Sequence, residues 1–294
     1  MAKRKYEQQI KTLQYQNYGK GPIRQGLDLT SQYLGIDACI KYGACWFAGR
    51  LGNEPYQPHV HDFDQVMLFL GTDMNDMSDL WGEVEFCIGE EMETHMITCS
   101  TVIAIPKGMP HMPATINRMD KRIVVAEISV TKEYSEKPFV TDKKPSGPVG
   151  MRPKYMKNVT PILFRRKGAW VYGPTNHDDG GGTISFIVTK DAGFDFVCLY
   201  ESMKKAPYRI GPNPDKPHTH PTTQCMMFLG TDPADLSKLN AEFEICIGKE
   251  EEKYTFTSPT AVICPPFIPH WPGGTIKQTQ PIIFLDVHPF GNDR

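Results

Sequence analysis

The chain has 294 residues, of which 40% are hydrophobic and 11% aromatic, enough for a sizeable core and too many for a disordered protein. Lys and Arg number 32 against 34 Asp and Glu, and this net charge of −2 argues against nucleic acid or an anionic membrane surface as a partner. The 25 glycines and 25 prolines indicate many turns, and therefore many short strands.

The sequence contains no stretch typical of a signal peptide or of a membrane-spanning helix. Its eight cysteines show no C-x-x-C spacing. A disulfide framework is typical of short secreted chains, which this chain does not resemble. We therefore expect reduced thiols in a cytoplasmic protein that does not enter a membrane.

Taken in chain order, the expected elements are mostly strands. An amphipathic helix is expected within 1–13 and a helical turn at 76–80. Residues 83–88 alternate between Glu or Cys and Val, Phe or Ile, which is the period of a strand with one apolar face. Further strands are expected at 101–105, 122–130, 242–247, 261–264 and 282–287. Short strands separated by Gly, Pro and Asp predict an all-β protein made of sandwiches or barrels.

The second half of the chain repeats the first. A shift of 159 positions aligns 58–113 with 217–272 without a gap, and 26 of the 56 aligned positions are identical. Such self-similarity indicates two copies of one fold. Residues 131–157 are rich in Pro, Lys and Arg and are expected to form an irregular linker. We therefore expect two domains, 1–150 and 151–294.

Six of the nine histidines occupy equivalent positions in the two copies. In each copy, two histidines are separated by one residue, so on a strand they point to the same face. A third histidine lies 50 residues beyond the second, after a proline-rich turn. A glutamine follows each pair, beyond turn-forming residues that allow the chain to fold back. This pattern predicts two metal sites, formed by His59, His61, Gln65 and His111 and by His218, His220, Gln224 and His270.

These motifs resemble those of two-domain cupins, or bicupins. The first family motif, H-x-H-x(3,4)-E-x6-G, is similar to 59–71 and 218–230. The second, P-x-G-x2-H-x3-N, is similar to 106–115 and 265–274. The resemblance implies two tandem cupin jelly-roll barrels, each with a metal inside the barrel, and assembly as a homodimer.

The chain departs from the family motifs at three places. Gln65 and Gln224 stand where the family has an acidic ligand, Phe267 replaces a glycine, and Thr115 and Gly274 replace the final asparagine. Three imidazoles and an amide oxygen are neutral, so a bound divalent ion would keep its full charge and be a stronger Lewis acid. Such donors suit Fe, Mn, Ni, Co or Zn, and we expect one ion per domain.

Two glutamates and an arginine near the motifs are candidate catalytic residues. Glu85 and Glu244 are candidate general acids or bases if their strand face is the barrel interior. If the Val, Phe and Ile side chains of those strands face inward instead, both glutamates are solvated. Arg50 precedes the first histidine pair and is a candidate partner for a substrate carboxylate.

Three functions are compatible with these features. The neutral ligand set favours lyase, isomerase or decarboxylase chemistry on a small oxygenated substrate, with the ion as a Lewis acid. One alternative, allowed by the resemblance, is a Fe-, Mn- or Ni-dependent dioxygenase that cleaves an enediol or phenolic compound. Another is a non-catalytic cupin that binds a metal or a small molecule. We expect the first site to be the roomier, because Gly108 and Met112 stand where the second copy has Phe267 and Trp271.

Overall fold

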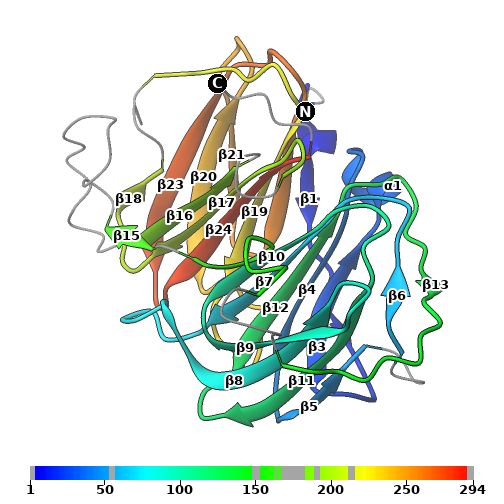
Figure 1. Ribbon diagram of the computed structural model, residues 1–294. Helices are drawn as coiled ribbons and strands as arrows, with labels where there is room; N and C mark the ends of the chain where they lie inside the picture. The colour runs from blue at the N-terminus through cyan, green and yellow to red at the C-terminus, as the bar shows by residue number, and fades with distance from the viewer. Residues whose placement is uncertain are drawn as a thin grey trace.

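The protein consists of two β-barrels that lie side by side in a computed structural model (Figure 1). Helical structure in the described part of the chain is limited to the 3-10 helix η1 (Glu7–Gln9) and the one-turn α1 (Ser31–Leu34), which confirms the all-β class. Among these residues there is no helix with the length and apolar character needed to cross a membrane. The structure describes residues 4–52, 57–147, 153–162, 164–166, 183–188, 193–210 and 216–289.

In the first barrel a large sheet packs against a smaller one, with apolar side chains between them. The large sheet has the order β14-β10-β7-β12-β4-β3-β2, and the small sheet has the order β13-β6-β11-β8-β9 with β5 beside β11. The strands are β2 (Gln16–Asn17), β3 (Ile23–Leu29), β4 (Cys39–Cys45), β5 (Gly49–Leu51), β6 (His59–Val60), β7 (Gln65–Gly71), β8 (Asp79–Ile88), β9 (Glu93–Cys99), β10 (Thr101–Ile105), β11 (His111–Met119), β12 (Ile123–Ser129), β13 (Lys137–Pro138) and β14 (Val159–Pro161).

The second barrel repeats this arrangement. Its large sheet has the order β1-β22-β19-β24-β17-β16-β15, in which the central strands correspond one to one with those of the first barrel. The facing sheet has the order β18-β23-β20-β21. The strands are β1 (Ile10–Thr12), β15 (Arg165–Arg166), β16 (Thr183–Val188), β17 (Val197–Met203), β18 (Tyr208–Arg209), β19 (Gln224–Gly230), β20 (Ala241–Ile247), β21 (Glu252–Phe256), β22 (Thr260–Cys264), β23 (His270–Gln278) and β24 (Ile282–His288).

The two barrels are joined by apolar packing between the outer faces of their large sheets. One continuous core cluster contains Leu68 and Ala126 from the first barrel and Met227 and Leu285 from the second, all fully or almost fully buried. Each large sheet is therefore covered on both faces, by its own barrel interior and by the neighbouring barrel. The domain boundary expected near residue 150 lies outside the described residues and stays a prediction.

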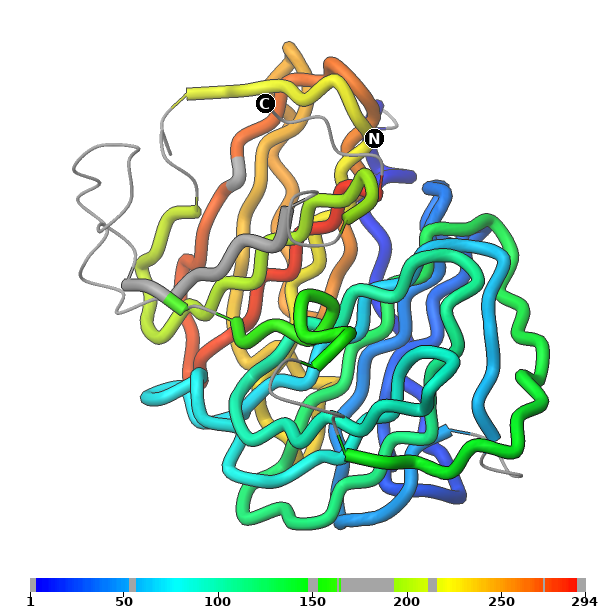
Figure 2. The backbone as a smooth tube through the Cα atoms, in the orientation of Figure 1, coloured from blue at the N-terminus to red at the C-terminus, as the bar shows by residue number. Residues whose placement is uncertain are grey.

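Each large sheet receives an edge strand from the chain segment that precedes the other barrel. β1 precedes the first barrel but pairs with β22 of the second, with Ile10 opposite Val262. β14 precedes the second barrel but pairs with β10 of the first, with Val159 opposite Ile103. Figure 2 shows the blue N-terminal segment beside the orange strands of the second barrel. The expected helix within 1–13 is therefore wrong, because pairing with the open edge of β22 holds Ile10–Thr12 extended.

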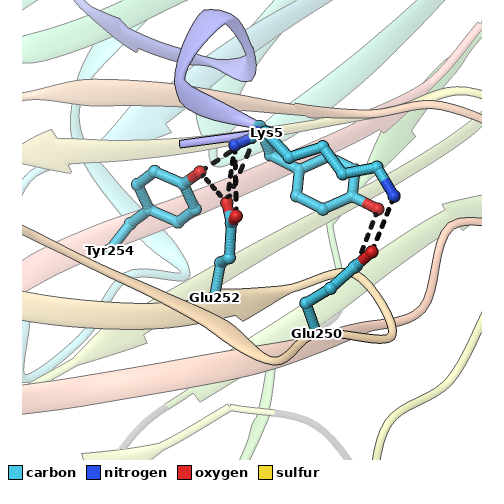
Figure 3. Close-up of polar contacts among 5 residues, drawn as sticks. Lys5, Glu250, Glu252 and Tyr254 are labelled. Carbon is cyan, nitrogen blue, oxygen red and sulfur yellow. Dashed lines mark hydrogen bonds and ion pairs between the residues drawn. The ribbon is translucent and has the colours of Figure 1, made fainter. Parts of the chain in front are cut away.

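A Lys-Tyr pair anchors the N-terminal arm to the second barrel (Figure 3). Lys5 Nζ lies 2.8 Å from a Glu250 oxygen, and the Tyr6 hydroxyl donates to the same carboxylate at 3.3 Å. The backbone N–H of Lys5 donates to Glu252 at 3.1 Å. The ring of Tyr6 lies so close to Gly248 that a Cβ there would be 2.2 Å from it, so this position requires glycine.

The same contacts anchor the second arm to the first barrel. Lys154 Nζ and the Tyr155 hydroxyl reach Glu91 at 2.6 and 2.5 Å, and the backbone N–H groups of both residues donate to Glu93. A Cβ on Gly89 would lie 2.0 Å from the Tyr155 ring. The two arms therefore dock in the same way, each onto the barrel that does not follow it.

The first described part of the linker, residues 131–147, runs along the first barrel, as do residues 153–157, which belong to the second arm. β13 pairs with β6, and the N–H of Thr94 donates to the carbonyl of Ser146 at 2.8 Å. This segment contains little regular structure, as its composition indicated, but its backbone contacts fix it against the strand that carries His59.

Replacing Tyr6 by Ala should destabilise the second barrel although Tyr6 precedes the first in sequence. Loss of a buried ring at this position is expected to lower the free energy of unfolding by ~3 kcal/mol. Amide hydrogen exchange should become faster in β20–β22 and stay unchanged in β8–β10. Tyr155→Ala is the matched control and should give the reverse pattern. Faster exchange in β8–β10 of the Tyr6 variant would contradict the exchange of arms.

Candidate metal centres

Three histidines of the first barrel converge from two neighbouring strands and the turn between β6 and β7. His59 lies directly opposite His111 in the β6–β11 pair, and their ring centroids are 4.4 Å apart. The ring of His61 lies 4.8 Å from His59 and 5.0 Å from His111. One nitrogen from each residue falls within 4.8 Å of the others, which is close enough for all three to bind one ion.

Hydrogen bonds on the far side of the rings orient these histidines. His61 Nδ1 lies 2.7 Å from the carbonyl of Ser135, and His111 Nδ1 lies 3.0 Å from that of Met109. Because a carbonyl only accepts, Nδ1 carries the proton in each ring and the Nε2 lone pair is available to a metal. Burial and the neighbouring His59 hold the pKa of His111 well below its usual value, so that imidazole is neutral.

Two buried acceptors of the first site have no hydrogen-bond partner among the described residues: His61 Nε2 and Gln65 Oε1. Gln65 is 1% exposed, and its amide nitrogen donates to the Ser129 hydroxyl at 3.1 Å, which turns the oxygen away from that residue. Buried acceptors left without a donor are costly unless something electropositive approaches them. The residues therefore fit a cation bound by His59, His61, His111 and Gln65.

The second barrel brings together the equivalent group. The His218, His220 and His270 nitrogens also lie within 4.8 Å of one another, and His270 Nδ1 lies 3.0 Å from the carbonyl of Ile268. Burial, with His218 nearby, lowers the pKa of His270 to about 4. His270 Nε2 and Gln224 Oε1 are again buried acceptors without a donor in the described part of the chain. This group fits a second cation.

The partner of the glutamine amide differs between the sites. In the second barrel the Gln224 amide donates to Asp286 Oδ2 at 2.6 Å, and that oxygen lies 3.3 Å from His288 Nε2. In the first barrel Ser129 holds Gln65, as described above. Sequence reasoning missed Ser129, Asp286 and His288, although their alternate positions on β12 and β24 put them on the inward face.

The first site opens into a cavity of about 520 Å³. Its wall is apolar at Met67, Met112 and Val125, and its charged residues are Lys20, Asp28, Lys41, Glu127 and Glu136. Strands β7 and β12 thus supply an apolar wall through Met67 and Val125.

In the second barrel three of the corresponding interior positions carry different side chains, and two of these, Glu201 and Phe284, are larger. Leu199 and Glu201 stand where the first barrel has Lys41 and Gly43, and Phe284 stands where it has Val125. The ring of Phe284 packs 5.2 Å from that of Phe228. Phe267 is 68% exposed, so it does not narrow the second site as expected; the larger side chains there are those of Glu201 and Phe284 on the wall.

The three expected catalytic residues lie away from this cavity. On β8 the buried side chains are Val84, Phe86 and Ile88, and Glu85 lies on the opposite face beside Met96, which is 51% exposed. Glu244 likewise faces out and pairs with Lys253 at 3.0 Å. Arg50 is exposed on β5, opposite Thr115. An acid–base role for Glu85 and Glu244, and substrate binding by Arg50, therefore have no geometric support.

The sequence matches no described protein family and no curated protein, whereas the fold has clear structural relatives. Oxalate decarboxylase of Lactobacillus farciminis, solved with formate, is similar at a TM-score of 0.59 and 10% identity over 95% of this chain and 85% of its own. A Bacillus subtilis oxalate decarboxylase structure concerned with its Mn(II) centres has a TM-score of 0.58 and 8% identity, over 95% of this chain and 76% of its own. The 7S globulin of Momordica charantia has a TM-score of 0.58 and 8% identity, over 96% of this chain and 83% of its own.

These similarities show that the chain has the fold of two-domain cupins, or bicupins, and the two three-histidine groups fit that fold. The predicted resemblance to bicupins and the predicted pair of tandem jelly-roll barrels are confirmed. At such low identity the relatives establish the fold and leave activity to the residues of the site.

Replacing His61 by Ala should reduce the metal content from two ions per chain to one. The first site would keep only two imidazoles, while the His218, His220 and His270 group is separate from it. Elemental analysis after loading with Mn(II) and desalting measures the change, and His220→Ala is the matched variant for the other barrel. Loss of both ions from either variant would show that the sites are not independent.

Gln224→Glu should destabilise the metal-free protein more than Gln65→Glu. The new carboxylate at 224 would face the buried carboxylate of Asp286, whereas the one at 65 would accept a hydrogen bond from Ser129. The difference in free energy of unfolding is expected to be roughly 2–4 kcal/mol. Thermal unfolding with and without Mn(II) measures it, because an ion should relieve the repulsion. Equal effects of the two substitutions would contradict the assigned partners.

Proposed function

We propose that this bicupin is a metal-dependent enzyme that acts on a small carboxylate substrate in its first barrel, by decarboxylase or related lyase chemistry. The observation that carries the proposal is that the histidines and the glutamine, with their unpaired buried acceptor atoms, lie beside an open cavity. The fold relatives that are oxalate decarboxylases, one studied for its Mn(II) centres and one solved with formate, support this class of reaction.

The residues of the first site would hold a divalent ion such as Mn, Fe, Co, Ni or Zn. Bound there, the ion would supply Lewis acidity, stabilising negative charge on the oxygens of a carboxylate and of the product formed from it. His59, His61, His111 and Gln65 leave its charge undiminished because all four are neutral donors. These ligands come from strands and backbone-anchored turns, so they are held in place before the substrate binds.

Other side chains of the cavity would control water and protons. Met67, Met112 and Val125 would cover the apolar part of a substrate and limit the access of water to it. Decarboxylation leaves a carbanion-like centre that must be protonated. Glu127 is one of three carboxylates that line the cavity, with Asp28 and Glu136. It lies opposite Met67, next to the ligand row, and it replaces Glu85 as the candidate proton donor.

For the second barrel we propose a metal ion with a structural role. Its three histidines and Gln224 match the first set, but its wall carries the larger residues Glu201 and Phe284 where the first barrel has Gly43 and Val125. The homodimer and the cytoplasmic location inferred from sequence stay predictions.

Metal-loaded protein should release carbon dioxide from a small carboxylate, with oxalate as the first probe. The assay compares protein loaded with each of the five metals, with and without oxygen, by mass spectrometry of the gas phase. His59→Ala should abolish turnover and His218→Ala should leave most of it. If turnover requires molecular oxygen and its atoms appear in the product, the dioxygenase alternative would be favoured. Metal binding without turnover of any carboxylate would favour the non-catalytic alternative.

A further inference from the structure

The glutamine of the second barrel is held by a carboxylate, whereas that of the first barrel is held by a hydroxyl. The Gln224 amide nitrogen donates to Asp286 Oδ2 at 2.6 Å, a short distance of the kind found with charged acceptors. The Gln65 amide nitrogen donates to the Ser129 hydroxyl at 3.1 Å. The two centres therefore share their candidate ligands but differ in the group that holds one of them.

The carboxylate permits only one orientation of the Gln224 side chain. A carboxylate accepts hydrogen bonds and donates none, so the amide nitrogen must face Asp286. The amide oxygen, which has no donor among the described residues, must then point away from it. The Ser129 hydroxyl can donate as well as accept, so it can contact either end of the Gln65 amide. Gln65 can therefore turn its oxygen or its nitrogen toward the first site, whereas Gln224 can present only its oxygen to the second.

A chain of polar contacts fixes Asp286 in its turn. The Thr222 hydroxyl lies 3.2 Å from His288 Nδ1, and His288 Nε2 lies 3.3 Å from the same carboxylate oxygen that holds Gln224. A shift of 159 positions places the following residues of the first barrel at these three positions: Phe63, Ser129 and Glu127. Because Phe63 has no polar side-chain atom, the chain of contacts cannot form in the first barrel.

Asp286 also brings a negative charge to the second centre. It is 6% exposed, and its Oδ1 has no hydrogen-bond partner among the residues that the structure describes. His288 contacts the other oxygen, through an imidazole nitrogen that can donate without being charged. A buried carboxylate oxygen without a donor favours a cation nearby. In the first barrel the equivalent carboxylate, Glu127, already has the ammonium group of Lys41 at 3.7 Å.

Resting on the proposed function, in which each barrel holds an ion, we infer that Asp286 is a positioning residue that makes the second barrel the tighter of the two metal sites. Asp286 keeps the Gln224 oxygen toward the ion, and its charge, acting through the amide, makes that oxygen a stronger electron donor. Gln65 is held by a neutral hydroxyl and is the more easily displaced ligand. The first site thus yields a coordination position to a substrate, whereas the second retains its ion.

The test measures Mn(II) affinity and not turnover. Metal-free protein is titrated with Mn(II), and the electron paramagnetic resonance signal of the free aqueous ion gives the bound fraction. The parent should show two phases whose dissociation constants differ roughly ten- to a hundredfold, the usual effect of a group that orients a metal ligand. His61→Ala should keep the tight phase, and His220→Ala should keep the weak one.

Asp286→Asn keeps the shape of the side chain, removes its charge and adds a donor. Both ions should then bind with the affinity of the first site, so the titration should show one phase. The unchanged weak phase separates a positioning role from a general loss of stability, which would affect both sites. Glu242→Gln removes a carboxylate that pairs with Lys277 on the outer face of the same barrel. It is the matched control and should leave two phases.

A reciprocal variant guards against an Asp286 substitution that fails to fold. Ser129→Asp puts a carboxylate where the Gln65 amide donates, and it should tighten binding at the first site severalfold. An unchanged first site in this variant, a single phase in the parent, or two unchanged phases in Asp286→Asn overturns the inference and leaves the proposed function standing. Absence of Mn(II) binding in the parent would overturn both.

Discussion

The packing of the two large sheets against each other is the constraint on which the rest of the structure depends. Because their outer faces are buried in one shared core, every second residue of β7 and β12 is committed to holding the barrels together. The alternate residues must then point into the barrel interior, and these are Gln65, Met67, Glu127 and Ser129. A one-residue slip of register would exchange the two sets and destroy both the interface and the site.

The histidines could be predicted from sequence because their spacing occurs twice and the ligand types are diagnostic. Lys41, Glu127 and Asp286 could not, since strands buried on both faces lose the alternation that shows which residues point inward. For Glu85 the sequence left two placements open, because the alternation shows that Val84 and Phe86 share a face and not which face is the inner one; the structure puts the apolar face inside. The arms were missed because their Lys-Tyr pairs are 149 residues apart, whereas the barrels repeat at 159.

The two copies agree in the residues that would hold an ion and differ in the walls around them. The ligands come from strand ends and turns where the copies agree in sequence. The walls come from β4, β12, β17 and β24, where exchanges such as Gly43 for Glu201 and Val125 for Phe284 decide whether space remains. A few substitutions in the wall thus change what a cupin barrel accepts without altering the ligand set.

The exchange of arms also determines when the molecule can be completed during its synthesis. The strand partner of Ile10, Val262, is made only after some 250 further residues have been added to the chain. Until then the N-terminal arm has no edge to pair with, and the edge of β10 stays open until β14 emerges. Contacts between residues so distant in sequence form late, and they reduce the rate of folding. The N-terminal arm is therefore made long before it can reach its native place.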